Sequence, residues 1–230
     1  LTYRGQTSQP DMTDLFNLTD NSNPLNIREG NPDLKPSFSN NIRLSYNNYF
    51  EVTRRSIFFN TDFSNNINSP TKRTIYNEQT GGQITKPVNT NGNWNINAEI
   101  GFNTPIFLET LTLNTSTSGG FNNRVSYLYQ NKETKENNVK SYNVRERLSL
   151  TLRLNYIDIR ANGNFNWNKS TSEVVQATNQ STFNFHYELS STGNFENGIG
   201  YTTNIGVNSR RGYSSAEMNT NEVLWNAQGS

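Results

Sequence analysis

Four arginines are the side chains of this sequence that could most readily bind a charged group. Arg145, Arg147 and Arg153 recur at even spacings, and Arg160 follows in the next stretch. Cations repeated along one face could attract anionic groups of a ligand. The same spacing also suits a solvated wall, in which charges pair with acids such as Glu146 and contribute little energy.

The single histidine, His186, has two interpretations. As a catalytic base it would need a serine and an acid nearby, and no motif in the sequence places them there. As a polar residue on the wet side of a strand it needs no such partners. We therefore predict no catalytic residue and expect that the protein is not an enzyme.

Metal and cofactor chemistry have no signature in the sequence. One histidine and no cysteine argue against a zinc site. Asp11, Asp14, Asp20 and Asp33 could bind calcium, but they lack the spacing of a calcium-binding loop. We expect no metal and no cofactor. The 20 basic and 19 acidic residues are interspersed, so we also expect no nucleic-acid partner.

A strand must position these arginines, because the residues between them are apolar at a period of two. The alternating apolar residues are Leu148, Leu150, Leu152, Leu154 and Tyr156. A two-residue turn at Ile157 and Asp158 would place Leu152 opposite Gly163. All apolar side chains then share one face of the hairpin. The other face carries the four arginines with Asn162, Asn164 and Asn166, which is too polar for a packed core.

The same alternation recurs along the chain and predicts about ten strands. Apart from that hairpin, the expected strands are 1–5, 39–49, 56–65, 94–102, 110–120, 181–195, a strand from 199, and one beginning at 223. Long loops are expected at 6–36, 66–92, 122–140 and 210–220, an intermediate one at 170–179, and short connections at 51–54, 103–109 and 196–198. Long and short connections alternate, which is typical of an antiparallel up-and-down sheet with long loops on one rim.

Composition and strand length favour a membrane wall. No apolar run reaches the roughly 18 residues of a helical span, and the chain is only 31% hydrophobic yet 12% aromatic. Strands of 10–15 residues exceed the usual globular length and suit a tilted bilayer span. Aromatic residues fall near strand ends, as at membrane interfaces. The sequence thus predicts an all-β fold, a segment of a transmembrane β-barrel in the bacterial cell outer membrane, with outer-membrane lipid as a partner.

One loop carries a more specific pattern. The residues before the second strand include Gly30, Asn31, Pro32, Asp33, Leu34, Lys35 and Pro36. This block resembles the GNPxLKPE segment of TonB-dependent outer-membrane receptors, and the preceding NSNPLNI resembles the Bacteroidetes-type outer-membrane β-barrel family. Ser37 stands where that family usually has Glu. Apart from the resemblance, the prolines and the glycine stiffen the loop as it enters the wall, so the block could be purely structural.

The resemblance implies a function. It implies that residues 1–230 are a single partial β-barrel domain, an excerpt of a longer chain without its plug domain. The whole protein would be a TonB-dependent receptor that takes up a bulky nutrient, such as a metal chelate, an oligosaccharide or a peptide. Its partners would be its own plug domain, TonB, the nutrient ligand and a surface lipoprotein. The lumen-facing candidates are then Arg145, Arg147, Arg153, Arg160, Asn162, Asn164 and His186.

Two alternatives remain open at this point. In a soluble or surface-anchored β-sheet module, structural, adhesive or carbohydrate-binding, the Leu148 to Leu154 stripe would pack on a second sheet instead of lipid. In a barrel-embedded hydrolase, His186 would be catalytic. Burial of Leu152, Ile159 and Phe185 inside a protein interior would overturn the membrane interpretation.

Overall fold

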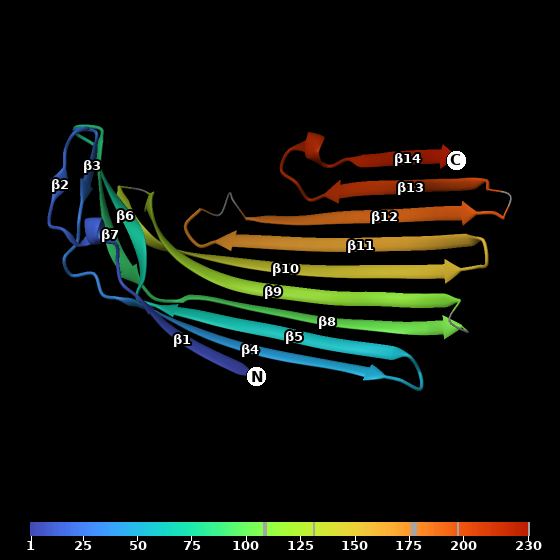
Figure 1. Cartoon of the computed structure of the whole chain (residues 1–230). Helices are drawn as coiled ribbons and strands as arrows, with labels where there is room; N and C mark the ends of the chain where they lie inside the picture. The colour runs from blue at the N-terminus through green and yellow to red at the C-terminus, as the bar shows by residue number, and fades with distance from the viewer. Residues whose placement is uncertain (108–109, 131, 176–178, 197, 230) are drawn as a thin grey trace.

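An antiparallel sheet of ten strands dominates the computed structural model. The structure describes residues 1–107, 110–130, 132–175, 179–196 and 198–229. In spatial order the strands are β1 (Thr2–Ser8), β4 (Ser37–Phe50), β5 (Arg55–Ile67), β8 (Asn93–Phe107), β9 (Leu111–Gln130), β10 (Glu133–Arg153), β11 (Ile157–Ser172), β12 (Gln180–Asn194), β13 (Gly200–Arg211) and β14 (Asn221–Gly229). Spatial order follows chain order (Figure 1), which confirms the predicted up-and-down, all-β architecture.

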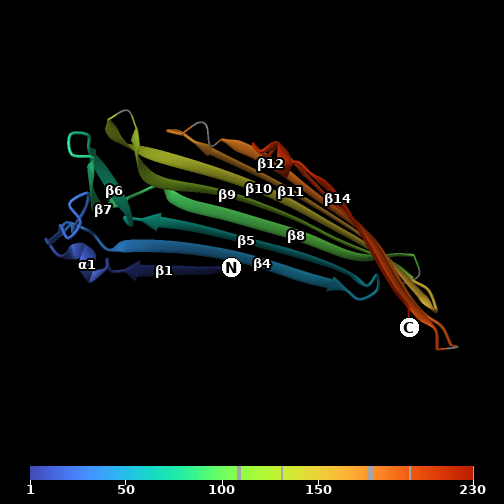
Figure 2. The ribbon, with the colours of Figure 1, turned by 90° about the horizontal axis from the view of Figure 1, so that it is seen from above.

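The sheet is a single curved layer (Figure 2). β1 and β14 form its two edges, so the described strands make an open wall and not a closed barrel. Apart from Pro87 and some glycines, Leu34 and Val125 are the only buried apolar residues in the described part of the chain. A conventional core between two layers is therefore missing from that part. Leu148, Leu189 and Ile205 remain 43%, 51% and 47% exposed.

The two faces of this sheet differ as the alternation predicts. Leu150 pairs with Leu113 on β9 and with Ala161 on β11, and Leu189 pairs with Ile205. We call this side the apolar face. Other residues of this face, in several rows, are Ile96, Phe121, Tyr142, Leu152, Ile159, Phe185 and Val207. The opposite side, the polar face, carries the predicted arginines and asparagines.

The register of the β10–β11 hairpin differs from the prediction. The turn lies at Asn155 and Tyr156, because Leu154 N donates to Ile157 O at 2.9 Å, and Leu152 therefore faces Ile159 instead of Gly163. Asparagine favours turns, whereas β-branched Ile157 favours the strand. The turn moves by two residues, and an even shift leaves every side chain on its predicted face.

The next hairpin joins β12 to β13 at the short connection predicted for 196–198. Leu189 faces Ile205, Tyr187 faces Val207, and Phe195 N donates to Ile199 O at 2.9 Å. Gly198 has a φ of +81°, the left-handed conformation expected for this turn. Residue 197, which the predicted turn includes, lies outside the described residues, as do 108–109 and 176–178 of two other predicted connections.

Two predicted loops are wrong, because they are largely strand. Residues 66–92 contain the hairpin of β6 (Ser69–Asn77) and β7 (Gly82–Thr90), and most of 122–140 extends β9 and β10. Likewise β8 continues through most of the predicted connection at 103–109. Both faces of a strand are wet beyond a membrane, so apolar residues no longer alternate there and the sequence pattern disappears.

A second sheet caps the rim that carries the long connections (Figure 1). Its order is β2 (Thr19–Asp20), β3 (Asn26–Glu29), β7 and β6, with β3 and β7 parallel. The short helix α1 (Met12–Leu15) lies within the connection predicted as a loop at 6–36, and a 3₁₀ turn (Ala216–Met218) precedes β14. The cap contacts the extended β9–β10 hairpin: Thr134 Oγ1 donates to Thr74 O at 2.7 Å, and the Tyr76 and Tyr129 rings lie 4.8 Å apart. Among the described residues, no helix has the length and hydrophobicity to span a bilayer.

Candidate functional site

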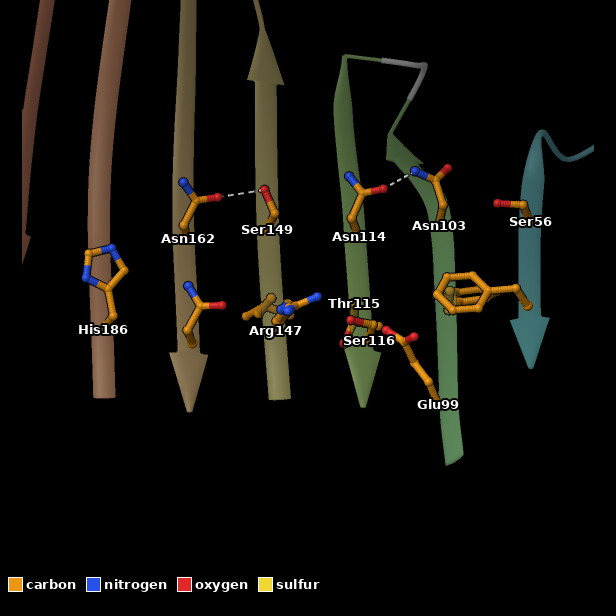
Figure 3. Close-up of a pocket in the computed structure, with 14 residues that line it drawn as sticks. Ser56, Glu99, Asn103, Asn114, Thr115, Ser116, Arg147, Ser149, Asn162 and His186 are labelled. Atoms are coloured by element: carbon orange, nitrogen blue, oxygen red, sulfur yellow. Dashed lines mark hydrogen bonds between the residues drawn. The ribbon is translucent and has the colours of Figure 1, made fainter. Parts of the chain in front are cut away.

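The polar face of the ten-stranded sheet is hollowed. One hollow, of about 470 Å³, is lined by residues of β5, β8, β9, β10, β11 and β12, including Arg147, Ser149, Asn162, Asn164 and His186. Figure 3 shows Arg147, Asn162 and His186 on three neighbouring strands that border the same space. A second hollow of about 500 Å³ adjoins it and shares Arg147, Asn164 and His186. The polar face is therefore the concave side.

The register places the candidate residues in rows across the sheet. Arg145, Asn166, Asn184 and Arg210 form one row, from β10 to β13, and Arg147, Asn164, His186 and Asn208 form the next. All seven lumen-facing candidates thus lie on one face, and four of them, Arg145, Arg147, Asn164 and His186, line the second hollow. Asn162 lines only the first hollow. Arg153 and Arg160 line neither and lie nearer the rim with the short turns.

Sequence reasoning missed several residues of the second hollow, among them Asn184, Asn208 and Arg210. Asn184 shares the alternation of His186, so the strand pattern contained the necessary signal. Arg210 was assigned to a loop, but β13 continues through it. Tyr213 lies beyond the strand, and its Oη donates to Asn184 Oδ1 at 3.0 Å. No pattern in the sequence predicts that contact.

Hydrogen bonds fix the polar side chains but leave the arginines unpaired. His186 Nδ1 lies 2.7 Å from Asn208 Oδ1. Asn162 accepts from Ser149 Oγ at 2.8 Å and donates to Glu188 at 3.2 Å. By contrast, the guanidinium groups of Arg145 and Arg147 make no hydrogen bond or ion pair with any described residue. They are free to bind a partner.

The arrangement favours binding over catalysis. In a serine hydrolase of the Ser-His-acid type, a carboxylate orients the histidine, whereas the amide of Asn208 contacts His186 here. The hollow combines guanidinium, amide and hydroxyl groups, which bind polar ligands without an activated nucleophile.

Glu146 does not pair with the arginines, although the sequence allowed a wall in which it would. It lies on the apolar face of β10, opposite Thr117 and Phe165. Thr115 Oγ1 donates to its carboxylate at 2.8 Å, and Thr117 Oγ1 donates to the other oxygen. Because acids and bases at consecutive positions of a strand point to opposite faces, their adjacency in sequence does not make an ion pair.

Aromatic side chains border the apolar face at both ends. Near the capped rim the Trp94 and Phe121 rings lie 4.6 Å apart, and those of Phe121 and Tyr142 lie 4.4 Å apart. Along β10, Tyr142 and Leu152 are separated by about 34 Å at ~3.4 Å per residue. With the usual barrel tilt of about 40°, this corresponds to about 26 Å along the bilayer normal, close to the apolar band of outer-membrane barrels.

At the opposite rim two short turns are joined. The Oη of Tyr156 donates to Glu196 Oε1 at 2.5 Å, and the ring of Tyr156 lies 6.4 Å from that of Phe195. This hydrogen bond to a carboxylate, with a smaller contribution from burial, raises the pKa of Tyr156 above its ordinary value. The contact stays intact at neutral pH because the phenol keeps its proton.

The block from Gly30 to Pro36 connects β3 of the cap to β4 of the large sheet. Leu34 is 6% exposed. Asn31 Nδ2 donates to Pro87 O at 2.9 Å, while Lys35 N donates to Asn89 Oδ1 at 2.8 Å. Pro32, Asp33 and Pro36 are exposed. The block therefore ties the start of β4 to β7, as expected of a structural loop.

Asn89 is the main tie between the block and β7. Its Oδ1 accepts from Lys35 N, and its Nδ2 donates to Lys35 O at 3.0 Å and to Asn68 O at 2.8 Å. We expect Asn89→Ala to destabilise the cap by about 1–3 kcal/mol, because three hydrogen-bonding groups lose their partner. Hydrogen exchange of the cap amides in the full-length protein measures the effect. Asn47→Ala, at an exposed position on β4, is the control and should leave exchange unchanged; equal protection in both variants would contradict the role of Asn89.

Comparison with known proteins agrees with this geometry. No curated protein matches the chain. The model of the family described as "Outer membrane protein beta-barrel family" matches residues 1–157, about two thirds of the chain. The matched part includes the cap, the block from Gly30 to Pro36 and the strands through β10. The chain therefore belongs to the outer membrane protein β-barrel family.

Proposed function

We propose that this chain forms part of the wall and outer loops of a TonB-dependent receptor in the bacterial outer membrane. Membership of an outer-membrane β-barrel family supports the location. Under this proposal the receptor takes up a bulky nutrient, such as a metal chelate, an oligosaccharide or a peptide. It acts by binding and transport, not by catalysis.

The height of the wall is the observation that carries the proposal. β9 and β10 are 20 and 21 residues long, whereas about 9–11 residues suffice to cross a bilayer. About half of each strand thus extends beyond the membrane, where the folded cap packs against it. A tall, capped wall around a polar lumen suits capture of a ligand too large for a simple diffusion pore.

The partners follow from the same proposal. TonB would supply energy through a plug domain inside the barrel, and a surface lipoprotein would present the nutrient at the capped rim. The resemblance of the Gly30 to Pro36 block to the segment of TonB-dependent receptors supports this assignment.

The soluble alternative needs a second sheet over the apolar face. In the described part of the chain the only other sheet is the cap, which lies at one rim. Leu148 and Leu189 are about half exposed. Hydrocarbon covers such a face in a membrane, whereas in water it would be an apolar patch far larger than monomers usually expose.

Growth of deletion strains tests the proposal. The gene is deleted in its host, and growth is measured with a ferric chelate as the sole iron source, a glycan mixture as the sole carbon source, or a peptide mixture as the sole nitrogen source. We expect a defect on one of these sources, restored by a plasmid copy only in a strain that has TonB. Growth on glucose serves as the control. Restoration without TonB would indicate passive diffusion and would contradict the proposal.

A further inference from the structure

We infer that the arginine hollow, lined by Arg145, Arg147, Arg210, His186, Asn184 and Asn208, binds a carboxylate or phosphate group of the transported nutrient. The inference rests on the proposed transport function, which leaves the class of nutrient open. It narrows that class to anionic compounds.

Geometry brings two guanidinium groups together. Arg145 and Arg147 are alternate residues of β10, so their Cα atoms are about 7 Å apart and their side chains project from the same face. Arg210 closes the far side of the hollow, three strands from Arg145 in the same row. With strands spaced by about 4.8 Å, the hollow is about 14 Å wide between these cations, which suits a group bound from both sides.

Charge is unbalanced in this hollow. Of the described residues that line it, three are arginines and none is acidic. Glu99 shares a row with Arg145, but it lies two strands away and no ion pair joins them. Glu222 lies opposite Asn208 on β14, four strands from Arg147. Glu188 is alternate to His186 on the same face, but its carboxylate accepts from Asn162 and Asn204 at 3.2 and 3.5 Å, and no ion pair joins it to Arg145 or Arg147. Two neighbouring guanidinium groups without an ion-pair partner favour an anion as occupant.

The side-chain amides of Asn184 and Asn208 each have a free N–H group that can donate to the same anion. Asn184 Oδ1 accepts from Tyr213 Oη, so its Nδ2 remains available as a donor. Asn208 Oδ1 is likewise engaged by His186, which leaves Asn208 Nδ2 as a donor. Guanidinium groups recognise carboxylate and phosphate through paired N–H donors. Amide donors on the facing strands supply the remaining contacts.

Calorimetry on the full-length protein in lipid nanodiscs tests the inference. The probes are citrate and inorganic phosphate, with maltose as the uncharged comparison, at low ionic strength. We expect Arg145→Gln with Arg147→Gln to weaken citrate binding at least tenfold. The matched control, Arg4→Gln with Arg43→Gln, removes the same charge from adjacent rows of the same face on β1 and β4. It should change the affinity less than twofold.

The outcomes distinguish failure of the anion site from failure of the proposed transport function. Equal weakening by both double variants would show that only the general field of the lumen attracts anions, and would overturn the site. The same holds for unchanged citrate affinity in the Arg145 and Arg147 variant. If that variant also retains TonB-dependent growth, the anion site fails while the transport function stands. Lost citrate binding together with growth that does not require TonB would instead retain the site and reject the receptor.

Discussion

Replacing Leu150 by arginine is expected to destabilise the folded protein in a bilayer by about 2–4 kcal/mol, the cost of a cation near the midplane of a barrel wall. Leu150 lies on the apolar face, between Leu113 and Ala161, eight residues from Tyr142 and six from Tyr156, the aromatic side chains near the two rims. Denaturant titration of the full-length protein in liposomes, followed by tryptophan fluorescence, measures the change in the free energy of unfolding.

The control lies one residue away. Ser149 points to the polar face, where its Oγ donates to Asn162, so Ser149→Arg should lose one hydrogen bond, about 1 kcal/mol or less. Thr151 is less suitable, because it is only 7% exposed and a large side chain would not fit. Similar losses for arginine at 149 and 150 would contradict the assignment of the faces.

The second large effect is expected at Gly30. A Cβ atom there would lie 1.7 Å from Phe16 O, a backbone atom that cannot turn aside. Gly30 N also donates to Leu18 O at 3.2 Å, which holds the two segments together. Gly30→Ala should therefore open this part of the cap at a cost of about 3 kcal/mol, the upper range for an overpacked site.

Trypsin digestion detects this opening at Arg28, which is exposed and lies two residues before the glycine. Cleavage follows the population of the open state, so its rate should rise about tenfold or more. Gly163→Ala is the matched control, since its Cβ would meet no atom closer than 3.9 Å. Cleavage at the wild-type rate in Gly30→Ala would show that the cap tolerates the methyl group.

The wall of the sheet was predictable because one physical constraint acts along it. A strand with lipid on one side and water on the other must alternate, and the stripe from Leu148 to Leu152 records that constraint. The turn lies two residues before the predicted position at Ile157 and Asp158. Because this shift is an even number of residues, every side chain still lies on its predicted face. Glycine at 198 fixed the register of the next hairpin directly.

The cap was not predictable by the same means. The strands β6 and β7 have water on one side and other polar loops on the other, so Thr, Lys and Asn replace the apolar signal. Its stability comes from specific contacts, such as those of Asn89 with Lys35 and Asn68. Pairing between distant loops leaves no local period in the sequence.

The candidate site was predictable in part. Alternation placed Arg145, Arg147, Asn164 and His186 on one face, but the rows depend on the register between strands. Only the register places Asn184 and Arg210 in the same row as Arg145. The same geometry separates Arg153 and Arg160 from the hollow, although the sequence treats all four arginines alike.

The most direct test of the two-faced wall is a scan with spin labels, which is straightforward because the sequence contains no native cysteine. Single cysteines at 147, 148, 149 and 150 are labelled in the full-length protein in liposomes, and collision rates with oxygen and with a water-soluble nickel chelate are measured. We predict that oxygen, which partitions into hydrocarbon, reaches the labels at 148 and 150 preferentially, and that the nickel chelate reaches those at 147 and 149. Nickel access at 148 and 150, or no alternation at all, would contradict the account.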